Sequence, residues 1–372
     1  MKAPRSVVEL LQALVRLPSV NPHGSPGTDG VGEGRIAAWL AKFLESLSAR
    51  VELREVLPGR PNVVAHWPGD RAGKPRVLFA PHTDTVSVEG MSIDPFAAEL
   101  RDTKIWGRGA SDTKGPMAAM LWALGECRDW LPALGHEIWF AGLMSEEADQ
   151  HGSRALAAQE RFDFVIAGEP TDLNVVHTHK GSAFLNLTTR GVAGHASLSE
   201  LGDNAITKML NVLELVRTEL AAEFAAQRDP VLGASTLSIG TIRGGTKTNV
   251  IPDRCDASVD LRFVPAHYRP TIIDEIAARL RRACPDLEVS AIPAPPLYTD
   301  PAHPLIGKLR ECGARTVGAP WFCDACYFAE RGMPAVALGP GSITQAHTKD
   351  EFIEVAELER GVEFFERFLG TL

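Results

Sequence analysis

The sequence predicts an α/β fold, a layered α/β/α sandwich that is interrupted by a smaller inserted domain. Short apolar runs of strand character alternate with helical patterns in the first half of the chain, which is typical of a sheet covered by helices on both faces. The order then changes to β-α-β-β-α-β, a ferredoxin-like arrangement. The alternating pattern resumes after a Pro-rich segment at 293–296. We therefore expect one domain formed by residues 1–179 and 293–372, with residues 180–292 inserted into it.

The first part of the chain contains amphipathic helices, apolar strands and glycine-rich turns. Apolar residues at helical spacing predict the helices, and short runs bounded by Gly, Pro or acidic residues predict the strands. A loop is expected from Pro18 to Gly34, where prolines and glycines gather. The expected helices are 7–15, 35–44 and 117–122, and the expected strands are 51–53, 62–65, 77–80, 137–144 and 164–168.

The inserted segment and the last part of the chain follow the same rules. In the insertion we expect strands at 183–189, 236–240, 255–262 and 287–290, with helices at 204–218 and 272–280. Beyond it we expect a helix at 305–317, a buried strand at 335–338, a loop at 339–342 that leads to His347, and a final helix at 355–369.

Composition limits the classes of function. The chain has 372 residues, 45% of them hydrophobic, and a net charge of -9, so nucleic acid and anionic membranes are poor partners. The first residues lead directly into a helical pattern, and neither a signal-peptide core nor a membrane-spanning run is found. The six cysteines are too sparse for a disulfide framework, which favours the cytoplasm.

A histidine and an aspartate follow the apolar run 77–80. His82 and Asp84 are two residues apart, so in an extended chain they point to the same side. At the carboxyl end of a buried strand such a pair lies where ligands bind, and a carboxylate beside a metal-bound imidazole commonly orients it. The alternative is a solvated loop pair.

Acidic residues occupy three further positions of this kind. Asp112 lies between glycines, just ahead of a helix start, where a helix N-cap or a turn aspartate is the simpler interpretation. Glu146 and Glu147 follow the strand 137–144, and as neighbours they cannot face the same way, so one could bind a metal while the other handles a proton. A solvated acidic helix start is the alternative. Glu169 follows the strand 164–168.

Together these residues form a metal-binding hypothesis. Two imidazoles and three carboxylates make a mixed nitrogen and oxygen set that suits zinc, or cobalt or manganese. Two metal ions held close together would need one bridging carboxylate. The candidate ligands are His82, Asp112, Glu147, Glu169 and His347.

Seven segments in the same order give the chain a specific resemblance. It resembles the dinuclear-zinc aminoacylase and exopeptidase family, which includes acetylornithine deacetylase, succinyl-diaminopimelate desuccinylase and glutamate carboxypeptidases. The matching segments are His82-Thr83-Asp84, Gly107-Arg108-Gly109-Ala110-Ser111-Asp112-Thr113-Lys114-Gly115, Ser145-Glu146-Glu147, Gly168-Glu169-Pro170-Thr171, Gly194-His195-Ala196-Ser197, Asn249-Val250-Ile251-Pro252 and Ala346-His347.

The resemblance implies a fold and a role for each residue. The first domain would be a zinc-exopeptidase-like catalytic domain, and the insertion a lid and dimerisation domain. Asp112 would bridge two metal ions, with His82 and Glu169 on one, and Glu147 and His347 on the other. Asp84 would orient His82, and Glu146 would be the general base.

The resemblance also assigns residues of the insertion. His195 would stabilise the oxyanion, from the partner subunit in dimeric members, although a core or surface histidine is the simpler interpretation. Asn249 would lie near the substrate. Arg262 would bind the substrate carboxylate, since guanidinium groups match carboxylates. A strand-edge salt bridge is the alternative for Arg262. Lys180-Gly181 would be the hinge of the lid.

One stretch departs from the family pattern. Asp324 is retained where relatives carry a Gly-Thr-Asp-Ala type sequence, but Cys323 and Cys326 flank it. A Cys-x-x-Cys pair can be redox-active or half of a zinc ribbon, and reduced, packed thiols are the interpretation we favour. This loop is expected to line the substrate pocket with Asp324. The amides of the loop 339–342, including Gly341, could receive a substrate carboxylate.

The sequence thus predicts a metal-dependent amidohydrolase. It would cleave an N-acyl amino acid, in the first place N-acetylornithine, using a metal-bound water and two zinc ions, with cobalt as an alternative. A desuccinylase, a general aminoacylase and a carboxypeptidase or dipeptidase keep the same mechanism. A catalytically silent binding protein on the same fold is the alternative from another class. The resemblance further implies a homodimer formed through the insertion.

Overall fold

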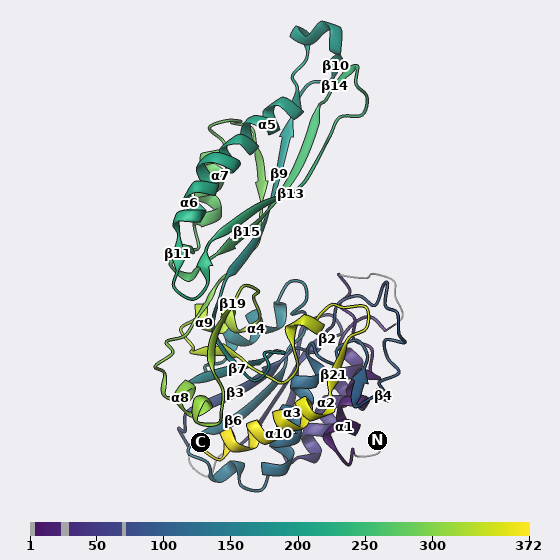
Figure 1. Cartoon of the computed structure of the whole chain (residues 1–372), viewed down its shortest axis with the longest axis vertical. Coiled ribbons are helices and arrows are strands. Elements are labelled where there is room, and N and C mark those ends of the chain that lie inside the picture. The colour runs from purple at the N-terminus through teal and green to yellow at the C-terminus, as the bar shows by residue number, and fades with distance from the viewer. Residues whose placement is uncertain (1–3, 24–29, 69–71) are drawn as a thin grey trace. The chain divides into compact units, whose positions relative to one another are not determined.

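The computed structural model describes residues 4–23, 30–68 and 72–372, and it divides into two compact units (Figure 1). The first unit contains the described residues up to His177, together with Tyr298–Val317 and Cys323–Leu372. The second contains Thr178–Leu297 and Gly318–Phe322, so it includes a short segment outside the predicted insertion 180–292. The loop predicted at 18–34 lies partly outside the described residues, which omit 24–29. No helix in the described ranges is both long and apolar enough to span a bilayer.

A mixed β-sheet forms the middle layer of the first unit. Its core is the parallel set β6 (Glu137–Gly142), β3 (Arg76–Pro81) and β7 (Phe164–Gly168), with β3 in the centre. The full strand order is β1-β2-β6-β3-β7-β20-β8-β18, with β19 beside β8. The remaining strands are β1 (Arg50–Leu57), β2 (Arg60–Trp67), β8 (Val175–His179), β18 (Leu297–Tyr298), β19 (Thr316–Ala319) and β20 (Ala335–Ala337), and a separate small sheet contains β4 (Glu99–Arg101), β5 (Lys104–Trp106) and β21 (Phe352–Glu354).

Helices cover both faces of this sheet, which confirms the predicted α/β class. On one face Phe79 of β3 meets Phe365 and Phe368 edge-on, at ring-centroid distances of 5.9 and 6.4 Å. On the other face Trp139 packs on Phe162, which in turn contacts Phe328. The first face carries α1 (Val7–Val15), α2 (Gly34–Ser46), α3 (Lys114–Cys127), α8 (Pro304–Glu311) and α10 (Val355–Leu369), and the second carries α4 (His151–Gln159) and α9 (Ala325–Glu330); short 3-10 turns are η1 (Leu131–Ala133) and η5 (Ile343–Gln345).

One predicted helix is wrong in its second half. The helix expected at 305–317 ends at Glu311, and β19 begins at Thr316. Gly313 follows the helix with a φ of 108°, a left-handed conformation that commonly ends a helix. The chain after this glycine is therefore extended and forms the strand β19.

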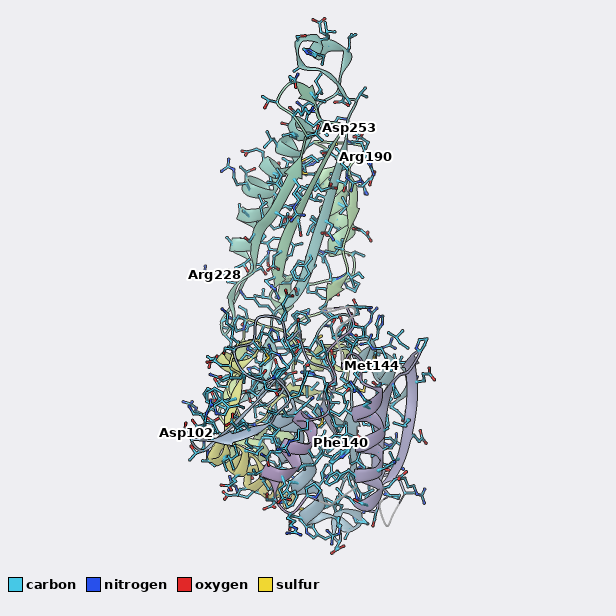
Figure 2. The ribbon with its side chains drawn as sticks, turned by 90° about the vertical axis from the view of Figure 1, so that its right-hand side faces the viewer. Asp102, Phe140, Met144, Arg190, Arg228 and Asp253 are labelled. Carbon is cyan, nitrogen blue, oxygen red and sulfur yellow. The ribbon has the colours of Figure 1, made fainter. Side chains whose placement is uncertain are left out.

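The second unit is an antiparallel sheet with helices on one face. Its strand order is β13-β15-β9-β16, and the chain runs β-α-β-β-α-β as expected. Alternate residues of β15 are buried against the helices. In Figure 2, Arg190 and Asp253 mark the end of β9 and the residue before β15. The elements are β9 (Gly181–Arg190), β10 (Gly194–His195), η2 (Ala196–Leu201), α5 (Ala205–Leu215), η3 (Val216–Leu220), α6 (Ala221–Ala226), β11 (Arg228–Asp229), β12 (Gly233–Ala234), β13 (Thr236–Gly244), β14 (Val250–Ile251), β15 (Arg254–Phe263), η4 (Pro265–His267), α7 (Ile272–Leu280), β16 (Glu288–Ser290) and β17 (Pro293–Ala294).

Candidate metal centre

Three of the candidate ligands follow the carboxyl ends of adjacent parallel strands. His82 comes directly after β3, Glu169 directly after β7, and Glu147 five residues after the end of β6. Figure 2 labels Phe140 on β6 and Met144 beyond the end of that strand. Parallel strands β6, β3 and β7 end at the same edge of the sheet, so their following residues converge there.

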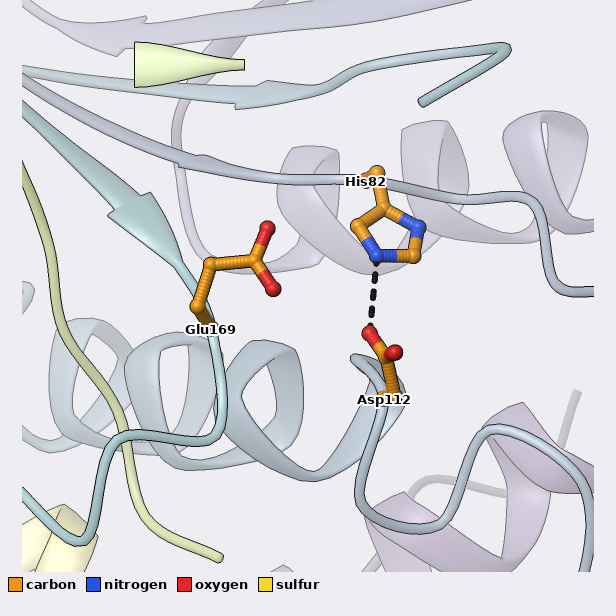
Figure 3. A group of neighbouring side chains, drawn as sticks. All are labelled: His82, Asp112 and Glu169. Carbon is orange, nitrogen blue, oxygen red and sulfur yellow. Dashed lines mark hydrogen bonds and ion pairs between the residues drawn. The ribbon is translucent and has the colours of Figure 1, made fainter. Parts of the chain in front are cut away.

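The first donor group contains His82, Asp112 and Glu169, and each of these residues is buried. Each offers one ligand atom, and the three atoms lie within 4.8 Å of one another. His82 Nε2 is 3.1 Å from Asp112 Oδ1, and the Glu169 carboxylate points toward the same space (Figure 3). Asp112 is not the N-cap of α3, because Thr113 occupies that position. The N-cap interpretation of Asp112 is therefore wrong.

The second donor group contains Asp112, Glu147 and His347, again within 4.8 Å. His347 Nε2 lies 3.0 Å from Glu147 Oε2 and 3.4 Å from Asp112 Oδ2. Asp112 thus directs one carboxylate oxygen to each imidazole, as a bridging ligand must. The Glu147 side chain is buried, whereas that of His347 is 55% exposed, so this group is open to solvent on the first unit.

The close contacts between acids and imidazoles shift the pKa values of these groups. Burial alone would lower the pKa of His82, but hydrogen bonds to Asp112 and Asp84 raise it well above its ordinary value. Hydrogen bonds to Asp112 and Glu147 raise the pKa of His347 to about 10. Burial and the charge of Asp112 raise the pKa of Glu169 and of Glu147. The carboxylates therefore create a negative potential around the imidazoles, which favours positive charge in the cluster.

The donor set fits two divalent cations. Oε1 of Glu147 is buried and has no hydrogen-bond partner among the described residues, which is costly for a carboxylate oxygen unless a cation binds it. Three carboxylates and two imidazoles supply oxygen and nitrogen ligands suited to zinc and neighbouring transition metals. His82 and Glu169 would hold one cation, Glu147 and His347 the other, and Asp112 both.

Comparison with known proteins decides the family. The model of peptidase family M20/M25/M40 matches residues 78–371, which include both donor groups. The chain belongs to this peptidase family. Acetylornithine deacetylase of Proteus mirabilis is 31% identical over 369 residues, covering 95% of this chain and 93% of that protein.

Solved structures of family members share the fold over nearly the whole chain. A metallo-carboxypeptidase of the M20 family from Sulfolobus solfataricus has a TM-score of 0.77 at 20% identity, covering 98% of this chain and 99% of that one. A dinuclear metal-binding peptidase of the same family from Bacillus subtilis has a TM-score of 0.69 at 14% identity, covering 98% and 96%. Together with the family match, these likenesses make the protein an M20 metallo-hydrolase.

Asp84 holds the turn that carries the two glutamates of this M20 chain. Its carboxylate accepts hydrogen bonds from Glu146 N at 2.9 Å and Glu147 N at 3.0 Å, and also from Asn21 Nδ2 at 2.8 Å. His82 Nδ1 lies 3.0 Å from the main-chain oxygen of Asp84 and 3.6 Å from its carboxylate. The shorter contact of His82 is therefore made by the Asp84 carbonyl, while the Asp84 carboxylate mainly fixes the glutamate turn.

A buried ion pair supports the same turn from the other side. Arg60 makes two hydrogen bonds to Glu33, at 2.6 and 2.7 Å, and Glu33 Oε1 also accepts Ser145 N at 3.2 Å. Ser145 has a φ of 67°, an uncommon conformation for a residue with a side chain. We did not predict Asn21, Glu33 or Arg60 as functional residues. The only sequence signal was a polar or charged side chain within otherwise apolar or loop segments.

Glu146 and Asp324 extend the acidic cluster of the M20 site. Glu146 is partly buried, and burial raises its pKa well above the ordinary value, helped by Glu169 and Asp324 and opposed by His82. Asp324 is buried and its Oδ1 accepts a hydrogen bond from Ser153 Oγ. Asp324 Oδ2 has no hydrogen-bond partner among the described residues, and burial raises the pKa of Asp324 to about 7.

The two cysteines beside Asp324 are buried. Burial raises the pKa of both Cys323 and Cys326 well above the ordinary value. Neither belongs to a metal-binding group among the described residues. Their burial agrees with packed thiols.

The predicted substrate residues of the insertion all belong to the second unit. His195 is exposed, and its Nδ1 lies 2.7 Å from Ser197 Oγ. Asn249 is exposed, and its carbonyl accepts Ala196 N. Arg262 Nε lies 2.9 Å from Asp260 Oδ1, so within this unit the guanidinium has a carboxylate partner of its own chain.

The loop at 339–342 offers fewer amides than we predicted. The Gly339 amide donates to Thr171 Oγ1 at 3.2 Å, and Pro340 has no N–H. Gly341 has a φ of 86°, and a Cβ there would lie 2.8 Å from Ser111 Oγ, so the chain passes too close for a side chain. The expectation of free amides throughout this loop is therefore wrong at Gly339.

Proposed function

We propose that this M20 metallo-hydrolase removes the acyl group from an N-acyl amino acid, with N-acetylornithine as its substrate. The observation that carries the proposal is the pair of donor groups that share Asp112, with Glu146 next in sequence to one of the ligands. The acetylornithine deacetylase of Proteus mirabilis, which aligns with nearly the whole chain, supports this substrate.

In the proposed reaction the cations and the side chains have different chemical roles. Zinc or cobalt ions held by the five ligands would act as Lewis acids, polarising the substrate carbonyl and lowering the pKa of water. Glu146 takes a proton from the attacking water at its carboxylate and passes it to the amide nitrogen as the C–N bond breaks. Asp84 fixes the backbone from which the Glu146 side chain extends.

The remaining predicted residues are proposed to bind the substrate. His195 is proposed to stabilise the oxyanion, with Asn249 near the substrate. Arg262 is proposed to bind the substrate carboxylate in exchange for its contact with Asp260. Asp324 and Gly341 are proposed to line the pocket. We propose that the second unit acts as a lid that closes about a hinge at Lys180-Gly181.

A panel of substrates tests the reaction and its substrate. Purified protein reconstituted with zinc or cobalt is assayed for amine release from N-acetyl, N-succinyl and N-formyl amino acids and from dipeptides. We expect N-acetylornithine to give the highest kcat/KM, and removal of the metal with a chelator to abolish turnover because the ligands alone cannot activate water. Readdition of cobalt should restore turnover.

Other outcomes of the panel select the alternatives. Preference for a succinylated substrate would identify a desuccinylase, broad turnover of N-acyl amino acids a general aminoacylase, and preference for dipeptides a carboxypeptidase or dipeptidase. Each of these keeps the proposed mechanism and replaces the substrate. Metal-loaded protein without any turnover would favour a binding protein on the same fold.

We further propose a homodimer formed through the second unit. Its edge strand β13 leaves backbone groups unpaired by the described sheet, and it exposes Ile239 and Ile242. A lysine on an edge strand opposes pairing, so Ile242→Lys should halve the molar mass measured by light scattering. Leu53→Lys, on the edge strand β1 of the first unit, is the matched control and should leave the mass unchanged. A wild-type mass of one chain would refute the dimer.

The cytoplasm remains the proposed location. Although thiols tend to pair in an oxidising compartment, no disulfide is formed by Cys127, Cys255, Cys284, Cys312 or Cys326.

A further inference from the structure

Glu351 is a buried carboxylate that neither the ligand set nor the proposed chemistry uses. It is fully buried, and it lies four residues after His347. Its Oε2 accepts Arg108 Nη1 at 2.6 Å and Gly109 N at 3.2 Å. Its Oε1 accepts Ser111 N and Asp112 N, each at 2.9 Å. One side chain thus binds a guanidinium and three backbone N–H groups of the segment that carries the shared ligand Asp112.

Only a carboxylate suits this position. All four partners of Glu351 are N–H donors, divided between its two oxygens. A glutamine has the same shape, but its amide NH₂ must face donors on one side, so at least one backbone N–H loses its acceptor. A buried donor without a partner is costly, and the loop is expected to move in order to satisfy it.

Arg108 extends the contact to the segment that carries His347. Its Nη2 donates to Thr348 O at 3.2 Å and to Ser87 O at 3.0 Å. Gly107 N donates to Glu351 O at 3.0 Å, which adds a backbone connection between the two segments. We call the pair Arg108 and Glu351, with the backbone groups they bind, the loop clamp.

The loop clamp acts on the ligands that do not follow a strand of the parallel core. His82 and Glu169 follow β3 and β7 directly, and the sheet register fixes them. Asp112 and His347 lie in loops, and the clamp holds the main chain at Asp112 and at Thr348, next to His347. The second donor group therefore depends on the clamp for two of its three ligands, and the first group for one.

We propose that Glu351 is a positioning residue, which together with Arg108 sets the separation of Asp112 and His347 and thereby the affinity of the second donor group for its cation. This inference rests on the proposed metal site. Glu351 itself supplies no ligand, so its replacement acts on the cation only through the two loops.

Cobalt binding to metal-free protein tests the proposal without any assay of activity. Titration calorimetry and visible absorption of Co²⁺ follow the two binding events in the full chain. Replacing residues that orient metal ligands typically lowers metal affinity by about 10–100-fold. We expect Glu351→Gln to weaken the second Co²⁺ by about this factor and to alter its absorption band, while the first Co²⁺ changes much less.

Two further variants separate positioning from general loss of stability. Leu309→Ala opens a cavity in α8, in the same core but outside the clamp, and it should leave both Co²⁺ affinities unchanged. Arg108→Lys keeps a cation beside Glu351 but loses the contacts of Nη2, so it should weaken the second Co²⁺ less than Glu351→Gln does. If Glu351→Gln does not fold, the Co²⁺ affinities of Arg108→Lys test the positioning role instead.

The outcomes distinguish this inference from the proposed function. Two unchanged Co²⁺ affinities in folded Glu351→Gln, or in Arg108→Lys if the first variant is unfolded, would overturn the positioning role. Equal weakening in Leu309→Ala would overturn it as well. If the wild-type protein binds no second Co²⁺, the proposed dinuclear site fails instead.

Discussion

Glu146→Gln is expected to lower kcat for N-acetylornithine by about a hundredfold to ten-thousandfold, the range typical for loss of a general base. The amide keeps the shape of the side chain but cannot take a proton from water. Since Glu146 is not among the donor groups, both cations should remain bound. Steady-state kinetics measures the loss, and elemental analysis of the dialysed protein measures the metal content.

A matched control is Glu137, at the amino end of strand β6, whose carboxyl end precedes Glu146. Glu137 begins β6 and contacts His66 and Arg76, so Glu137→Gln removes a charge from this strand away from the proposed centre. Its kcat should stay within about twofold of the wild type, since substitutions away from a functional site usually act on stability rather than on turnover. Near-wild-type turnover in metal-loaded Glu146→Gln would show that another group moves the proton.

Three alanine variants should lose metal in a pattern set by the shared ligand. His347→Ala removes a ligand of the second group alone, and His82→Ala a ligand of the first, so each should retain one tight cation. Asp112→Ala removes a ligand from both groups and should retain none. Losing a direct ligand should weaken a site more than the roughly 10–100-fold typical of an orienting residue. Cobalt titration of the metal-free proteins gives the stoichiometries.

The control for this series is a histidine outside both groups. His136 contacts the carbonyl of Leu372, and His136→Ala should still bind two cations. Asp112→Ala must weaken both cation sites, because a bridging carboxylate is a ligand of both. Retention of two cations by Asp112→Ala, in protein with a native circular dichroism spectrum, would exclude Asp112 as the bridge.

Part of the candidate site was predictable because several of its residues directly follow the ends of strands. A histidine or an acid after an apolar run lies at the carboxyl edge of a parallel sheet, and this rule placed His82 and Glu169 together before any coordinates. Asp112 and His347 lie in loops, so the strand-end rule does not place them. Their residue types made them candidate ligands, and the family resemblance assigned their roles. The structure brings both of them to the same centre.

The supporting contacts were not predictable, because they join distant segments through the backbone. Asp84 binds two main-chain amides of the glutamate turn, and Glu351 binds three amides near Asp112. Hydrogen bonds to main-chain N–H groups leave no trace in the types of residue that supply them. The end of α8 at Glu311 depends on Gly313, whose φ of 108° ends the helix, and helical spacing of side chains alone does not reveal such a backbone conformation.

The order of the ligands along the chain has a consequence for how the protein matures. The donor groups draw on positions from 82 to 347, with the whole of the second unit inserted between Glu169 and His347. A ribosome releases the chain from its N-terminus, so a nascent chain exposes His82 and Asp112 long before the last ligand exists. Closing such long loops costs entropy that only the completed fold offsets. We therefore expect the second donor group, which needs His347, to bind its cation only after nearly the whole chain has been synthesised.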